Sequence, residues 1–131
     1  MITGGVLLSI LANMILGTIY YSPFVLGKPW SKMTGAGPDK MKKDQIIFMM
    51  AGGAFLALLN AAILAFLMQQ YEVSSYNQAL LFGGTIWLGF LTPTIFLNNM
   101  YQMKPILLSV IDSGFQLISI LAMSVILYLF I

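Results

Sequence analysis

The chain has 131 residues, of which 60% are apolar and only 8% are charged, and its formal net charge is +2. Soluble domains average about 45–50% apolar and about 25% charged residues, so this composition cannot build a water-facing surface. The absence of cysteine and histidine excludes disulfides, Cys/His metal sites and imidazole proton relays. We therefore predict an all-α integral membrane protein that needs no cofactor.

Four apolar segments are separated by three polar interruptions, and each segment is long enough to cross roughly 30 Å of hydrocarbon at about 1.5 Å per residue. We expect one domain over residues 1–131, a compact bundle of four transmembrane helices. The predicted helices cover about residues 2–21, 45–69, 78–101 and 106–130.

Small and polar residues recur every four positions on one narrow face of the first predicted helix. Such a face lets membrane helices approach closely, so we expect Gly5, Ser9 and Gly17 to pack against another helix. Asn13 lies on the same face, and its amide needs a partner at membrane depth, either in packing or in a polar cavity.

The predicted loop 22–44 carries five of the six lysines. By the positive-inside rule this loop is cytoplasmic, and both termini of the multi-pass protein then lie outside the cell membrane. We expect Trp30, Lys28 and Lys32 to anchor the loop at the interface, with the indole at headgroup level. Lysines also attract anionic lipid at about 1 kcal/mol each, but topology alone is sufficient to explain them.

The second predicted helix carries the most regular small-residue ridge of the chain, at a spacing of four residues. Its members are Gly53, Ala57, Ala61 and Ala65. We expect this ridge to contact a helix of the same protomer or of another protomer. Asn60 lies beside the ridge, and we interpret its role as mostly packing.

Pro93 predicts a kink in the third helix, because it has no N–H to donate to the Gly89 carbonyl. Water is absent from the hydrocarbon, so the freed carbonyl needs another donor, such as Thr92 or a neighbouring helix. We interpret this kink as architecture and not as mechanism.

Asp112 lies inside the fourth predicted helix, where a carboxylate costs roughly 2.5–3.5 kcal/mol on insertion scales. Other polar residues follow at spacings of three and four, so this face must look into the bundle, an oligomer interface or water. By distance along the helices, further polar groups lie in the same half of the membrane as Asp112. This does not require that these groups touch one another. The candidate intramembrane polar site comprises Asp112, Gln116, Asn13, Thr92 and Asn98.

Several stretches resemble the signatures of a small membrane family, domain of unknown function family 1761. The main one is residues 20–30, YYSPFVLGKPW, which is similar to the pattern that closes the first helix in that family. The others are Trp87-Leu-Gly-Phe, Thr92-Pro93-Thr94 with Asn98, and Asp112-Ser-Gly-Phe-Gln. The resemblance implies the four-helix fold and no activity. Asp112 and Gln116 stand where the family pattern has Asn and His, so it supports no imidazole role here.

Three functional hypotheses remain, and we favour a non-enzymatic packing, assembly or accessory component in which Asp112 is protonated or hydrogen-bonded to an amide such as Asn13 or Gln116. The alternative is a small proton- or cation-coupled transporter or channel that uses Asp112. An enzyme is disfavoured, because an aspartyl protease needs two carboxylates and a serine–histidine dyad needs histidine. The expected partners are the lipid bilayer and a second copy in a homodimer, with no nucleic acid.

Overall fold

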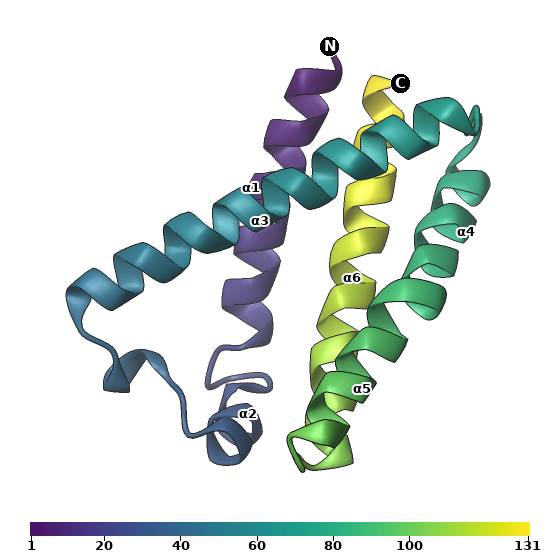
Figure 1. Ribbon diagram of the computed structural model, residues 1–131. Coiled ribbons are helices and arrows are strands. Elements are labelled where there is room, and N and C mark those ends of the chain that lie inside the picture. Colours follow the sequence, from purple (N-terminus) through teal and green to yellow (C-terminus); the bar gives the residue numbers. More distant parts are fainter.

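The computed structural model describes residues 1–131 except for the side chain of Pro38, and its regular elements within that range are helices (Figure 1). In chain order they are α1 (Ile2–Tyr20), α2 (Gly27–Thr34), the short 3-10 turn η1 (Pro38–Lys40), α3 (Lys43–Gln70), α4 (Tyr76–Ile86), the π-helical segment η2 (Trp87–Leu91), α5 (Thr92–Tyr101) and α6 (Ile106–Phe130).

Four helical stretches are long and apolar enough to cross a membrane. They are α1, α3, the continuous run from α4 through η2 to α5, and α6, with 19, 28, 26 and 25 residues respectively. The prediction of an all-α membrane protein with four transmembrane helices is therefore confirmed.

The segment predicted as the loop 22–44 contains the helix α2. Pro29 is accommodated because it lies in the first turn of α2, where a backbone N–H has no partner within the helix. The helix ends at Gly35, whose φ of 74° is the left-handed conformation that glycine adopts without steric cost. Pro29 in the first turn and Gly35 at the C-terminal end are thus compatible with a short helix inside the predicted loop.

Helix α6 is the centre of the structure, with α1 on one side and α4 and α5 on the other (Figure 1). Helix α3 runs obliquely across α1 and α6, and the two chain termini lie at the same end of the molecule. With 28 residues α3 is about 42 Å long, which exceeds the hydrocarbon thickness of about 30 Å, and it lies oblique to the other spans (Figure 1).

The ridge on α3 lies in the buried core. Ala57, Ala61 and Ala65 are at most 2% exposed, and they belong to one buried cluster with Met123 and Leu127 of α6. Methyl side chains allow α3 to pack closely against α1 and α6 although its axis is oblique to theirs (Figure 1). Gly53, at the start of the ridge, is only partly buried and lies outside this cluster.

The small-residue face of α1 packs against aromatic rings of α6. A Cβ atom on Gly5 would come within 3.0 Å of the Phe130 ring, and one on Gly17 within 3.3 Å of the Phe115 ring. Ser9, between them, is completely buried. The two glycines therefore leave room for the rings, which brings the whole length of α1 against α6.

The third span departs from regular α-helix just before Pro93. The π-helical segment η2 occupies the preceding turn, and the Thr92 N–H donates to the Trp87 carbonyl. The Thr92 hydroxyl is buried and has no hydrogen-bond partner in the described part of the chain, so Thr92, one of the two donors that we considered for the Gly89 carbonyl, does not serve it. The wider π turn adapts the backbone around the proline instead.

Candidate functional site

The Asp112 carboxylate on α6 is half-buried, and its partner is a phenol. The Tyr21 hydroxyl donates a hydrogen bond of 2.8 Å to Asp112 Oδ1, and the Trp30 indole lies next to the same carboxylate. An amide partner, such as Asn13 or Gln116, was one of our two expectations for Asp112, and neither amide is hydrogen-bonded to it among the described residues. The carboxylate therefore faces the segment that follows α1 and not the amides of the bundle.

A tight turn places Tyr21 and Trp30 on the same carboxylate. After Tyr20 the chain folds back, with the Leu26 N–H bonded to the Tyr20 carbonyl at 3.1 Å and the Gly27 N–H bonded to the Ser22 carbonyl at 2.8 Å. A Cβ atom on Gly27 would collide with the backbone of Tyr21 and Ser22, so only glycine fits this close approach. Helix α2 starts directly at Gly27, and its first turn delivers Trp30.

Four aromatic rings surround this junction, and we name Tyr20, Tyr21, Trp30 and Phe115 the aromatic clamp. The Tyr21 ring lies 5.3 Å from the Trp30 ring and 5.4 Å from the Phe115 ring, both in edge-on geometry. Tyr20 lies 5.0 Å from Tyr21 and 5.5 Å from Phe115. These centroid distances lie in the favourable range for aromatic pairs, so the clamp holds the end of α1 and the start of α2 against α6.

Two features of helix α6 accommodate the aromatic clamp, namely a backbone acceptor and a glycine. The Tyr20 hydroxyl donates a hydrogen bond of 2.6 Å to the Ile111 carbonyl. A Cβ atom on Gly114 would come within 2.8 Å of the same hydroxyl oxygen, so glycine keeps the surface of α6 open at that point. Tyr20 therefore binds the backbone of α6 one position before the residue whose side chain Tyr21 binds.

The other members of the predicted polar site lie elsewhere. Asn13 Oδ1 accepts a hydrogen bond from the Ser119 hydroxyl, which ties α1 to α6 deeper in the bundle than Asp112. The Thr92 hydroxyl is buried without a hydrogen-bond partner among the described residues, and Asn98 is exposed on α5. No hydrogen bond among the described residues joins any two of the five predicted residues.

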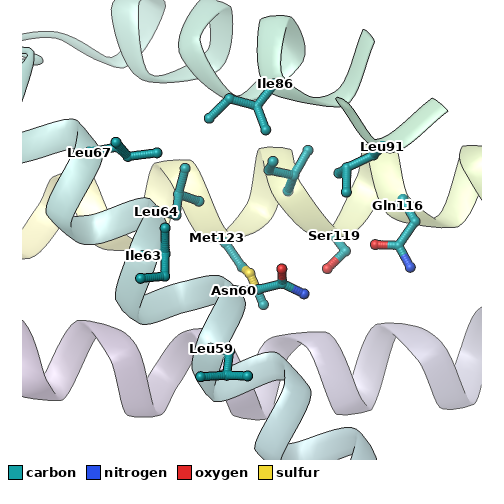
Figure 2. Close-up of a pocket in the computed structure, with 11 residues that line it drawn as sticks. Leu59, Asn60, Ile63, Leu64, Leu67, Ile86, Leu91, Gln116, Ser119 and Met123 are labelled. Carbon is teal, nitrogen blue, oxygen red and sulfur yellow. The ribbon is translucent and has the colours of Figure 1, made fainter. Parts of the chain in front are cut away.

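Gln116 lines a cavity of about 260 Å³ between α3, the third span and α6 (Figure 2). Apolar side chains such as Leu64, Ile86 and Met123 form most of its wall. Its polar lining groups are the side chains of Asn60, Gln116 and Ser119. Asn60, which we interpreted as a packing residue, therefore points its amide toward a cavity beside the ridge.

The expected interfacial anchors divide into two groups. Trp30 packs into the aromatic clamp, whereas Lys28 and Lys32 on α2 are exposed and line an open groove together with Lys40. The indole contacts other rings of the protein, and its position at headgroup level stays a prediction. The lysines remain at the surface, at the end of the molecule opposite the two termini (Figure 1).

Sequence reasoning missed Tyr21 and Trp30 as neighbours of Asp112. A signal was present, because residues 20–30 and the stretch that starts at Asp112 both carry the family resemblance. Two signatures separated by about 80 residues of chain, roughly the length of two transmembrane spans with their connections, are candidates for contact in a small bundle. The structure brings these two together at the aromatic clamp.

A family model described as a protein of unknown function (DUF1761) matches residues 5–128. The match covers all four membrane spans, the aromatic clamp and the cavity. No curated protein and no solved structure matches the chain. The aromatic clamp and the cavity therefore lie within residues 5–128, the part of the chain that the family model matches.

Proposed function

The chain belongs to the DUF1761 family, whose function is unknown, and from this premise we propose that it is a non-enzymatic packing, assembly or accessory component of the membrane. The observation that carries the proposal is the hydrogen bond of 2.8 Å between Tyr21 and Asp112. In this role Asp112 ties the interfacial helix α2 to the central span α6.

The surroundings of Asp112 support a structural role. Its carboxylate already has a phenol donor, and the rings of the aromatic clamp occupy the space beside it. Buried polar groups with satisfied hydrogen bonds fix the relative position of helices, because breaking them leaves an unpaired group in a medium of low dielectric constant. Asp112 is also the single carboxylate at membrane depth, whereas aspartyl protease chemistry needs two.

Proton- or cation-coupled transport is the second candidate. It is favoured by the presence of a half-buried carboxylate inside a membrane span, one helical turn before a residue that lines a cavity. In this role Asp112 would exchange its bond to Tyr21 for a proton or a cation during the transport cycle.

One experiment separates the two candidates. Wild-type protein and Asp112→Asn are reconstituted in liposomes for proton and cation flux over a range of pH, and both are unfolded thermally in detergent. We expect no flux from either protein and similar stability, because the asparagine oxygen still accepts from Tyr21. Flux in the wild type that is lost in a folded Asp112→Asn protein would establish transport and refute the structural role.

We propose further that loop 22–44 is cytoplasmic and that both termini lie outside. The positive-inside rule supports this orientation, since Lys28, Lys32 and Lys40 line one groove. Helix α2, which carries the first two, lies at the end of the molecule opposite the termini (Figure 1).

A homodimer is the assembly that this proposal favours. The outer face of α3 carries exposed apolar side chains, among them Phe48, Phe55 and Leu56, and a second copy or lipid covers it. Chemical cross-linking of the purified protein at several dilutions distinguishes a dimer from a monomer.

A further inference from the structure

The cavity between α3, the third span and α6 contains two amide side chains that lack partners. Asn60 and Gln116 make no hydrogen bond within the part of the chain that the structure describes, although both line the same space of about 260 Å³ (Figure 2). Each amide has two N–H donors and one oxygen acceptor. Their partners must therefore come from outside the protein.

Because the cavity lies near the middle of the membrane, leaving these two amides without hydrogen bonds costs free energy. Gln116 and Ser119 lie about 15 and 20 Å along α6 from Ile106, which is the middle of a hydrocarbon layer of about 30 Å. A polar group at this depth without a hydrogen bond costs several kcal/mol, since lipid chains offer neither donors nor acceptors. A molecule that brings an oxygen to the two amides removes that cost.

The walls define the chemistry of such a molecule. Among the described residues that line the cavity none is charged, and most are apolar, such as Leu64, Ile86, Leu91 and Met123. An ion would remain unpaired there, whereas an uncharged group fits the lining. The volume exceeds the roughly 150 Å³ of a protein cavity that binds benzene, so it holds a substituted ring or a comparable apolar group.

The cavity is accessible from the bilayer. Asn60 is exposed, and its neighbours on the rim, Leu59 and Ile63, are 46% and 57% exposed. A lipid-soluble molecule reaches Asn60 sideways from the hydrocarbon without crossing the headgroups. The π-helical segment η2 contributes Leu91 to the opposite wall, and π turns inside α-helices are frequent at functional sites.

We propose that this cavity binds an uncharged, lipid-soluble molecule that presents a carbonyl oxygen to the amides of Asn60 and Gln116. The ligand class goes beyond the role of Asp112, which lies outside the cavity lining. Ser119 offers a further acceptor, because its hydroxyl hydrogen is directed to Asn13.

Two probes of equal tail length test the proposal on wild-type protein in lipid nanodiscs: 2-decyl-1,4-benzoquinone, which has two carbonyl groups, and decylbenzene, which has none. A ligand that binds only the folded state raises the unfolding temperature as its concentration passes the dissociation constant. We expect a saturable rise with the quinone and none with decylbenzene. Equal shifts with both probes, or no shift with either, overturn the proposal.

Substitutions then locate the site. Asn60→Leu and Gln116→Leu should each weaken quinone binding about tenfold, the effect of one lost hydrogen bond to a neutral partner. Asn98→Leu, which removes an exposed amide of α5 outside the cavity, should leave binding unchanged. Binding that survives both cavity substitutions overturns the assignment. If either leucine variant fails to fold, Gln116→Met and the comparison of the two probes on wild-type protein still decide the question.

Discussion

The Tyr21 hydroxyl and Asp112 Oδ1 are 2.8 Å apart, although the two residues are 91 positions apart in the chain. Tyr21 follows the last residue of α1, and Asp112 lies in the second turn of α6. Their bond therefore connects the first and the last span close to the point where helix α2 begins. Few interactions hold this junction together. Single substitutions should therefore change its stability measurably.

Tyr21→Phe should lower the free energy of unfolding by about 1–3 kcal/mol, since it leaves the half-buried carboxylate without its donor. The measurement is denaturant unfolding in detergent micelles. Tyr101→Phe is a matched control, because Tyr101 is 79% exposed and its hydroxyl has no hydrogen bond among the described residues. If the two variants lose equal stability, the bond between Tyr21 and Asp112 does not hold the junction.

A double-mutant cycle gives the coupling between the two side chains. Tyr21→Phe and Asp112→Leu each break the same bond, so the double variant should be less destabilised than the sum of the single variants by about 0.5–3 kcal/mol. Additive losses in the same micelle assay would contradict the contact.

Gly27→Ala should disrupt the turn after α1 and cost about 1–3 kcal/mol, because a Cβ atom there would collide with the backbone of Tyr21 and Ser22. The clamp should open with the turn, so the fluorescence of Trp30 should shift to longer wavelength in a Trp87→Phe background. Gly52→Ala is the control, since a Cβ atom at Gly52 meets no atom within 4 Å. It should be neutral or slightly stabilising, as expected for alanine in a helix.

Ala61→Leu should destabilise the crossing of α3 over α6 by about 1–3 kcal/mol, because Ala61 is completely buried and the added carbon atoms have no space. Ala62→Leu introduces the same side chain one position along the same helix, where the residue is exposed. Thermal unfolding in micelles should separate the two variants. Equal unfolding temperatures would show that the ridge is not a close contact.

The proposed orientation is open to cysteine labelling, because the chain has no cysteine of its own. Single cysteines are introduced by Ala36→Cys, before α3, and by Gln70→Cys, at its far end; both positions are exposed. A membrane-impermeant maleimide should label position 70 in intact cells and position 36 only after permeabilisation. The reverse pattern would place loop 22–44 outside.

The sequence by itself determined the membrane location, the four spans and the residues that allow close helix contact. Apolar runs of membrane length and small residues at a spacing of four are local patterns, and they need no knowledge of the partner helix. The buried ridge of Ala57, Ala61 and Ala65 is an example, as is the irregularity before Pro93.

Only the tertiary structure decided which polar groups meet. Depth along the helices placed Asn13 and Asp112 in one half of the membrane, but depth does not define direction around the bundle. Asn13 turns to Ser119, whereas the turn at Gly27 carries Tyr21 and Trp30 to Asp112. The cavity beside Asn60 likewise exists because the long helix α3 crosses α6 obliquely. Such pairings depend on how each helix is rotated and on the angles at which helices cross. Contacts between side chains distant in sequence determine both, so no local pattern encodes the pairings.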